Sequence, residues 1–247
     1  MKNKSIAVIP ARGGSKGLLK KNIQLFQDHP LISWPIQAAR KSKKLDKIVV
    51  STDDEEIKNI ALEYGAEVPF LRNEEVSLDL TTTEETLRFS LKKAEEFYKT
   101  EFDICVFLTC TDLFRSESWI DTAIEKLENN KHLESVFVVS KTHKNFWKIK
   151  DNSPERLEEW MIIYSNRQVR EPLYREDTGL TCASRSFLWR EGRRIGDKVE
   201  FIINNNPASM IDIHSELDLN IANKTADWLK VNDPNSLPVT PQKILKK

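Results

Sequence analysis

Short apolar runs alternate with amphipathic stretches along most of the chain. Ser5 to Ile9 and Asp103 to Leu108 are dense in β-branched and apolar residues, as is typical of strands buried on both faces of a parallel sheet. The other expected strands are Asp46 to Ser51, Val68 to Leu71, Val136 to Ser140, Val199 to Ile203 and Ser209 to Ile213.

Between these runs, apolar residues recur at helical spacing. Thr52 with Glu55, and Thr82 with Glu85, have the spacing of capping boxes that open two helices, the first of which ends at Gly65. The other expected helices are Leu31 to Ser42, Ser116 to Leu127 and Ser215 to Leu229. The alternation predicts an α/β fold with a mainly parallel sheet and ligands outside the carboxyl ends of the strands.

The loop after the first strand is the strongest candidate for a functional site. Pro10 is expected to end the strand, and three glycines follow within Arg12 to Gly17. Such a backbone can adopt positive φ and approach an anion closely. The loop matches neither the Walker nor the Rossmann glycine pattern. Its cations suit a polyphosphate, although a solvated basic turn would have the same composition; they are Arg12, Lys16, Lys20 and Lys21.

The loop sequence also carries a family resemblance. Ile9-Pro10-Ala11-Arg12-Gly13-Gly14-Ser15-Lys16-Gly17, followed by Lys21-Asn22, resembles the signature of the CMP-sialic acid synthetases, or acylneuraminate cytidylyltransferases. The similarity continues through Ser51-Thr52-Asp53, Arg72, Asp79 and the segment Ile211 to Asp218. It therefore spans most of the chain and implies a Rossmann-like nucleotidyltransferase architecture.

The resemblance implies that a sugar's anomeric hydroxyl attacks the α-phosphorus of CTP, with a divalent cation assisting the departure of pyrophosphate. The acceptor would be sialic acid or a related nonulosonic acid, and the product would serve nucleotide-sugar, lipopolysaccharide or capsule biosynthesis. Residues matching family positions near the nucleotide are Ala11, Arg12, Gly13, Ser15, Lys16, Lys21, Asn22, Arg72 and either Thr82 or Thr83. Positions expected to face the acceptor are Thr109, Lys148, Arg167 and Arg175, although surface charge would equally explain the three basic residues.

The expected metal site departs from the family pattern. Asp212 is the candidate Mg²⁺ ligand, at the end of the expected strand Ser209 to Ile213. The sialic acid enzymes typically have Asp-Ile-Asp where this chain has Asp212-Ile213-His214. Either Asp212 holds the cation with water and phosphates while His214 has a hydrogen-bonding role, or His214 binds a softer ion such as Mn²⁺. Glu216 and Asp218 are best explained as acids of a helix's first turn.

A second departure lies at Leu108-Thr109-Cys110-Thr111-Asp112-Leu113-Phe114-Arg115, where family members commonly read Leu-Gln-Pro-Thr-Ser-Pro-Leu-Arg. Thr109 replaces a glutamine associated with the acceptor, and Arg115 is either a catalytic residue or a structural one. These changes favour an unusual acceptor or a degenerate acceptor site.

Four parts follow from these features: a nucleotide-binding part (1–140), an excursion for dimerisation and acceptor binding (141–174), a return to the α/β domain with the metal motif (175–231), and a tail (232–247). The excursion mixes aromatic and charged residues without a clear period. In the resembled family this portion packs against a second subunit, so we expect a homodimer.

Composition narrows the range of partners. Lys plus Arg equals Asp plus Glu at 38 each, so no net field attracts nucleic acid or a membrane surface. The sequence has neither a transmembrane run nor the apolar core of a signal peptide, which favours the cytoplasm. Three cysteines without Cys-x-x-Cys spacing are expected to be reduced packing residues: Cys105, Cys110 and Cys182.

The expected function is CMP transfer from CTP to a keto-sugar acid with Mg²⁺. The alternatives are a CMP-Kdo-type or sugar-1-phosphate nucleotidyltransferase, and a catalytically weak nucleotide-binding regulatory protein.

Overall fold

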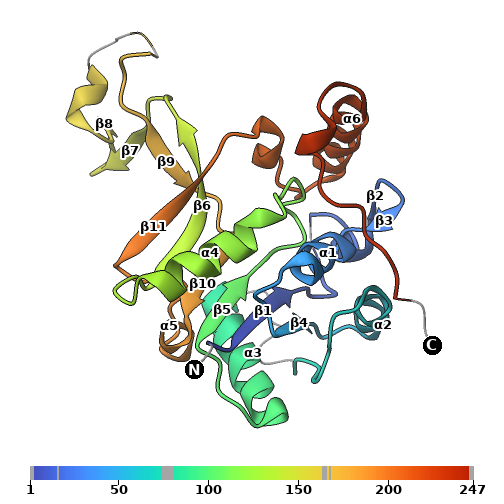
Figure 1. The fold of residues 1–247 in the computed structure, drawn as a ribbon. Coiled ribbons are helices and arrows are strands. Elements are labelled where there is room, and N and C mark those ends of the chain that lie inside the picture. The colour runs from blue at the N-terminus through green and yellow to red at the C-terminus, as the bar shows by residue number, and fades with distance from the viewer. Residues whose placement is uncertain (1–2, 16, 74–80, 163–165, 167, 245–247) are drawn as a thin grey trace.

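A seven-stranded sheet forms the centre of the molecule in the computed structural model (Figure 1). The structure describes residues 3–15, 17–73, 81–162, 166 and 168–244. Along the sheet the strand order is β11-β6-β10-β5-β1-β4, and β9 also pairs with β6. The strands are β1 (Ser5–Pro10), β4 (Lys47–Ser51), β5 (Ile104–Phe107), β6 (Ser135–Thr142), β9 (Leu173–Glu176), β10 (Cys182–Arg185) and β11 (Val199–Asn204).

Helices cover both faces of this sheet. The helices are α1 (Ser33–Lys41), α2 (Glu55–Tyr64), α3 (Thr83–Tyr98), α4 (Ser118–Asn129), α5 (Ser186–Arg190) and α6 (Glu216–Asn232). Apolar residues of α1, α2, α4 and α6 form one buried cluster with one face of the sheet, and those of α3 and α5 form another. Successive β1 residues enter opposite clusters, Ile9 the first and Val8 the second. Burial on both faces explains the uninterrupted apolar run of β1.

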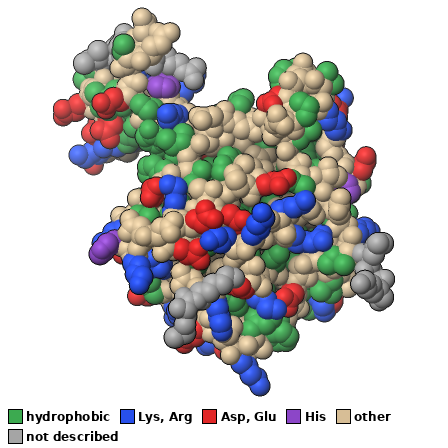
Figure 2. All heavy atoms as spheres, viewed as in Figure 1, with side chains coloured by type: hydrophobic (Ala, Val, Ile, Leu, Met, Phe, Trp, Pro, Cys, Tyr) green, Lys and Arg blue, Asp and Glu red, His purple; other side chains and the backbone are tan. Residues whose placement is uncertain are grey.

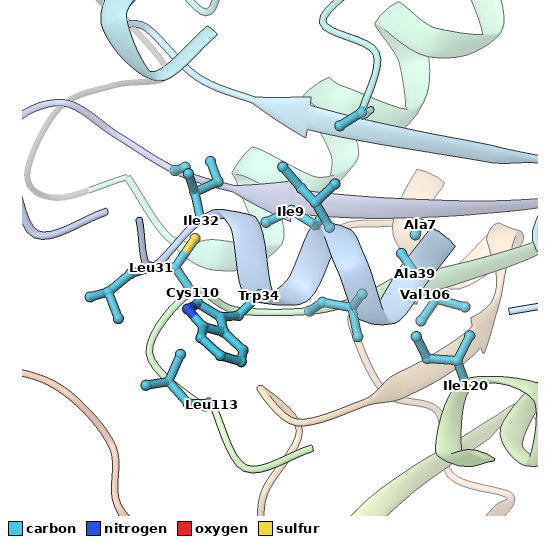
Figure 3. Close-up of a cluster of buried hydrophobic side chains, with 14 of the residues drawn as sticks. Ala7, Ile9, Leu31, Ile32, Trp34, Ala39, Val106, Cys110, Leu113 and Ile120 are labelled. Atoms are coloured by element: carbon cyan, nitrogen blue, oxygen red, sulfur yellow. The ribbon is translucent and has the colours of Figure 1, made fainter. Parts of the chain in front are cut away.

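The first cluster joins distant parts of the chain. Figure 3 shows Ile9 of β1, Trp34 of α1 and Leu113 from the segment after β5 among its closely packed side chains. Cys110 belongs to the same cluster, and all three cysteines are buried and free, as the sequence predicts. Burial raises the pKa of the Cys110 thiol to about 12.

The mainly parallel α/β architecture is confirmed. β1 pairs in parallel with both β4 and β5, and β11 pairs in parallel with β6. β10, which runs antiparallel between β5 and β6, was not predicted from the sequence. Its residues, Cys182-Ala183-Ser184-Arg185, lack the β-branched and aromatic side chains that usually signal a strand. Pairing on both sides creates this strand.

Two other strand predictions are wrong. At Val68 to Leu71 there are only isolated bridges, from Glu67 to Val49 and from Leu71 to Thr52. Pro69 lies between them and has no N–H for a ladder. At Ser209 to Ile213 the chain instead forms the 3-10 helix η4 (Pro207–Met210), which starts with a proline after the cap Asn206. Asp212 therefore follows a helical turn and makes one isolated bridge to Asp112.

One of the two capping boxes predicted from the sequence is present in the structure and the other is not. Thr82 and Glu85 form the expected capping box of α3. The Thr52 prediction is wrong, because the Asp54 carboxylate accepts from Glu56 N and Ile57 N at 2.8 and 3.0 Å and caps α2 instead. At α6, Ser215 and Asp218 form a capping box.

An arm extends away from the sheet body. β6 continues to Thr142 and β9 begins at Leu173, so these strands form its base. Beyond them lies the hairpin of β7 (Trp147–Lys150) and β8 (Ser153–Arg156), whose turn residues Asp151 and Asn152 have φ of 50° and 62°. A short helix, η3 (Glu159–Ile162), follows. Figure 2 shows the arm as a separate lobe, which suits the excursion expected from the sequence.

The small elements near the first loop complete the fold. They are η1 (Lys21–Ile23), β2 (Leu25–Phe26), β3 (His29–Pro30) and η5 (Pro234–Ser236). The C-terminal segment runs along α1 and α2, where Arg40 Nη1 donates to Gln242 O at 2.8 Å and Ile244 N donates to Glu63 O at 2.8 Å. Among the described residues, no helix is both long and apolar enough to span a membrane.

The contact between this segment and α2 generates a prediction about Gly65. Gly65 has φ of 94°, and a Cβ there would lie 2.5 Å from Ile244 Cδ1. Gly192 has φ of 80° but open space around it, so Gly192→Ala measures the backbone penalty alone. We expect Gly192→Ala to lower the free energy of unfolding by about 1 kcal/mol and Gly65→Ala by roughly 2 kcal/mol. Urea denaturation measures both, and equal losses would contradict a role for the Ile244 contact.

Candidate active site

A cavity of about 490 Å³ opens where β1 and β5 end. Pro10 is the last residue of β1 and Phe107 the last of β5, and both line it. The chain passes from β1 to β4 on one side and later returns to β5 on the other, so the strand order reverses at β1. Crevices at such reversals are the usual ligand sites of open α/β sheets. The other lining residues are Arg12, Ser15, Gly17, Leu18, Lys21, Asn22, Arg72, Thr81, Thr83, Thr86, Thr109, Cys110, Thr111 and His214.

Partly buried hydrogen bonds hold the glycine-rich loop in place. Asn22 Nδ2 donates to Arg12 O at 2.8 Å, and Gly13 N donates to Asp53 Oδ1 at 3.0 Å. Ala11 is buried just before this point. A Cβ on Gly13 would lie 2.6 Å from Asp54 Oδ2, and one on Gly17 would lie 2.6 Å from His214 O. Both glycines are therefore required for close packing, and the Gly13 N–H already has a protein acceptor.

Two cations reach the cavity in partly desolvated settings. Burial lowers the pKa of Lys21, against the opposing charge of Asp212. Burial likewise lowers the pKa of Arg72, whose Nη2 lies 3.6 Å from Asp53 Oδ1, too far for a hydrogen bond. Arg72 Nε and Nη2 are buried and have no hydrogen-bond partner among the described residues. An anion in the cavity would satisfy these donors.

The start of α3 forms another wall. Thr82 is exposed and its hydroxyl accepts from Glu85 N at 3.1 Å, so this side chain caps the helix. Thr83 lines the cavity together with Thr81 and Thr86. Of the two threonines expected near the base, the structure thus places Thr83 at the cavity and gives Thr82 a capping role.

The segment after β5 is fixed by Arg115. This buried guanidinium donates from Nη2 to Thr109 O at 3.2 Å and to Gly179 O at 2.8 Å, and from Nε to Leu180 O. Burial lowers its pKa to about 10. Because its nitrogens bind main-chain carbonyls, Arg115 is a structural residue, the second of the two roles considered for it.

His214 lines the cavity and pairs with Asp212, which is not itself one of the lining residues. His214 Nε2 is 2.7 Å from Asp212 Oδ2, and both side chains are substantially exposed. Within the described residues, no group of three or more His, Cys, Asp or Glu is arranged to hold a metal ion. Mg²⁺ nevertheless often binds through only one or two protein carboxylates, with substrate phosphates and water as its other ligands.

The remaining candidates lie elsewhere. Lys148 is on the arm, 3.5 Å from Glu155, and Arg175 Nε donates to Asp177 Oδ1 at 2.7 Å; neither lines the cavity. Lys16, Asp79 and Arg167 lie outside the described residues. Thr81 and Thr86, which line the cavity, were not predicted from the sequence, and neither was Asp112. The position of Asp112, five residues after the carboxyl end of β5, is the sequence feature that could have indicated it.

Comparison with known proteins now identifies the family. The family model described as cytidylyltransferase matches residues 6–196. The chain belongs to the cytidylyltransferase family. This membership confirms the resemblance found in the loop and makes the protein a nucleotidyltransferase.

Curated relatives of this cytidylyltransferase cover nearly its full length. It is 31% identical over 229 residues to the CMP-N,N'-diacetyllegionaminic acid synthase of Legionella pneumophila, covering 89% of this chain and 94% of that protein. It is 30% identical to the post-translational flagellin modification protein B of Campylobacter coli, covering 87% and 92% respectively.

Solved structures share the fold. CMP:2-keto-3-deoxy-manno-octonic acid synthetase, complexed with CTP, superposes with a TM-score of 0.65 at 14% identity over 91% of this chain and 99% of that one. The 4-diphosphocytidyl-2C-methyl-D-erythritol synthase of Anaerococcus prevotii gives 0.63 at 16% identity, over 92% and 100%. These likenesses confirm the Rossmann-like nucleotidyltransferase architecture.

The unsatisfied donors of Arg72 generate a prediction. Arg72→Met removes a buried guanidinium whose Nε and Nη2 have no hydrogen-bond partner among the described residues. Asp53 would still accept the hydrogen bond from Gly13 N in this variant. We expect the free energy of unfolding to stay equal or rise, and the affinity for CTP, measured by calorimetry, to fall at least about tenfold.

Arg190→Met is the matched control, because Arg190 lies outside the cavity and pairs with Glu95. It should leave the CTP affinity unchanged. A large loss of stability in Arg72→Met with normal CTP affinity would reverse the assignment and make Arg72 a structural residue.

Proposed function

We propose that this cytidylyltransferase transfers CMP from CTP to the anomeric hydroxyl of a sialic, legionaminic or related nonulosonic acid and releases pyrophosphate. The main support is the cavity at the strand reversal, where Arg12, Lys21 and Arg72 gather in a chain of this family. The relative named CMP-N,N'-diacetyllegionaminic acid synthase supports the acceptor class.

In the proposed reaction the acceptor's hydroxyl oxygen bonds to the α-phosphorus of CTP. The bond from that phosphorus to the bridging oxygen of pyrophosphate breaks, pyrophosphate takes that electron pair, and the hydroxyl proton is released. Arg12, Lys21 and Arg72 would offset the charge that gathers on the leaving group. Their positions are set by the fixed loop and by buried contacts, so little reorganisation is needed when the substrate binds.

The threonines at the start of α3 are the proposed side for the cytidine. Thr81, Thr83 and Thr86 line the cavity with hydroxyls that both donate and accept. Asn22 anchors the loop through Arg12 O, so its effect on the nucleotide would come mainly through loop geometry.

A divalent cation is part of this proposal. Mg²⁺, when bound, would neutralise phosphate charge, and Asp212, which contacts the cavity-lining His214, is the carboxylate that would hold it. The His214 Nε2–H donates to the Asp212 carboxylate and would orient it.

Pyrophosphate release tests the reaction. We expect release only when CTP and a keto-sugar acid are both present, and not with ATP or with either substrate alone. Arg12→Ala and Lys21→Ala should each lose roughly 2 kcal/mol of transition-state stabilisation. Lys20→Ala is the neighbouring comparison: the Lys20 ammonium lies 2.6 Å from Glu56 and does not line the cavity, so this variant should keep close to wild-type activity. Equal activity in all three variants would show that the triphosphate does not bind at this loop.

The metal proposal has its own test. Asp212→Ala should nearly abolish turnover, and excess Mg²⁺ should restore little because the anchoring carboxylate is gone. If His214 only orients Asp212, His214→Asp keeps or improves Mg²⁺-dependent turnover; if His214 binds the ion, the wild type prefers Mn²⁺ and the variant shifts toward Mg²⁺. Rates with each metal separate these cases. An active Asp212→Ala protein with unchanged metal dependence would exclude this site.

We further propose a homodimer formed through the arm, consistent with its exposed apolar side chains. Ile149 is 70% exposed and Ile162 is 63% exposed. Sedimentation at micromolar concentration should give twice the chain mass for the wild type and a larger monomer fraction for Ile149→Lys. Val231→Lys, which changes an 81% exposed apolar residue on α6, should not alter the dimer. A monomeric wild type would contradict the proposal.

A further inference from the structure

One carboxylate lies between the glycine-rich loop and the buried guanidinium of the cavity. Asp53 Oδ1 accepts from Gly13 N at 3.0 Å, and Arg72 Nη2 lies 3.6 Å from the same oxygen. The first distance is that of a hydrogen bond and the second is not. Arg72 N donates to Thr52 O at 2.8 Å, so the backbone holds Arg72 beside the segment that carries Asp53. The guanidinium therefore stays close to a carboxylate without a hydrogen bond from Nη2 to it.

The position of Asp53 is set by the loop and not by Arg72. Its Oδ1 is bound to the Gly13 N–H, and the next side chain, Asp54, occupies the space beside Gly13, where a Cβ would lie 2.6 Å from Asp54 Oδ2. Asp54 in turn caps α2. Asp53 thus belongs to a packed corner between the loop, β4 and α2. A shift of its carboxylate toward Arg72 would break the bond from Gly13.

The Arg72 guanidinium has unused donors next to this carboxylate. Its side chain is 5% exposed, it lines the cavity, and Nε and Nη2 have no hydrogen-bond partner among the described residues. Burial lowers the pKa of Arg72, the charge of Asp53 opposes this effect, and the like charge of Arg12 adds to it. A buried guanidinium without hydrogen bonds is unfavourable, and oxygens of an anion in the cavity would relieve this.

We propose that Asp53 is a positioning residue that competes with the phosphates of CTP for Arg72. In the free enzyme Asp53 holds the guanidinium at the cavity wall. When CTP binds, Arg72 donates from Nε and Nη2 to phosphate oxygens, and Asp53 keeps only its bond from Gly13 N. The same carboxylate then repels the bound phosphates, so it weakens the affinity for CTP and for the product pyrophosphate. The inference rests on CTP as the substrate in the proposed function.

Calorimetry with Asp53→Asn tests this competition. Asparagine keeps an oxygen that can accept from Gly13 N and removes the charge. We expect the affinities for CTP and for pyrophosphate to rise about fivefold or more, and the affinity for cytidine, which has no phosphate, to stay unchanged. Structural damage would weaken binding, so a gain in affinity separates the competition from a merely structural role of Asp53.

Two further variants test whether the gain depends on Arg72. Asp54 is the matched control, because it is the neighbouring half-buried carboxylate and forms no ion pair with Arg72 in the part of the chain that the structure describes. Asp54→Asn should change the CTP affinity less than about twofold. Arg72→Met removes the group for which Asp53 and phosphate compete. Adding Asp53→Asn to Arg72→Met should therefore also change the CTP affinity less than about twofold.

The wild-type protein allows a second measurement that does not depend on the folding of an Asp53 variant. In protein labelled with ¹⁵N-arginine, the Nε–H signal of Arg72 is the one that is absent from Arg72→Met. This signal should shift, and its hydrogen exchange should slow, when CTP or pyrophosphate is added, because Nε then gains an acceptor. Cytidine should leave it unchanged. A signal that does not respond to saturating CTP would overturn the inference.

The outcomes distinguish this inference from the proposed reaction. If the wild type binds CTP but Asp53→Asn shows no gain, if Asp54→Asn shows an equal gain, or if the gain persists without Arg72, the competition is wrong and the reaction stands. Tighter CTP binding by Asp53→Asn, with no pyrophosphate release by the wild type from CTP and any keto-sugar acid, overturns the reaction alone. A wild type that binds neither CTP nor pyrophosphate overturns both.

Discussion

The parallel pairing of β1 with β4 on one side and β5 on the other is the constraint on which the site depends. It brings Pro10, Ser51 and Phe107 to the same edge of the sheet. The segments after β1 and β5 line the cavity there, and Asp53, just after β4, accepts from Gly13 N in the first of them. The buried clusters on both faces hold these strands in register. Changes that disturb this packing would therefore move the residues around the cavity together.

Charge is arranged unevenly around this cavity. Asp53 accepts from Gly13 N and faces Arg72, so one carboxylate links the glycine-rich loop to a buried guanidinium. The burial that lowers the pKa of Arg72 and of Lys21 also means that their charges are incompletely compensated by the protein. An anionic ligand would compensate the charges of Arg72 and Lys21. We therefore expect these two residues to favour ligand binding at some cost to folding stability.

Much of this architecture could be predicted from local patterns. The long apolar runs of β1 and β5, the Thr82–Glu85 capping box and the Ser215 start of α6 are local features, and each was found where the sequence indicated. β10 could not be predicted in this way, because its small residues become a strand only where two neighbouring strands supply partners. The wrong prediction at Ser209 to Ile213 did have a local signal against it, since the cap Asn206 and Pro207 favour a helical turn.

The sequence by itself determined the alternation of strands and helices and the cationic glycine loop, because both follow from the chemistry of neighbouring residues. Only the tertiary structure decided that Thr83 and not Thr82 faces the cavity, that Arg115 serves main-chain carbonyls, and that Asp212 pairs with His214. Only the structure also placed Gly179 against Thr109 and Asp112. These contacts join residues whose approach is set by strand pairing and close packing, and no local pattern encodes the direction in which a side chain points once several partners compete for it.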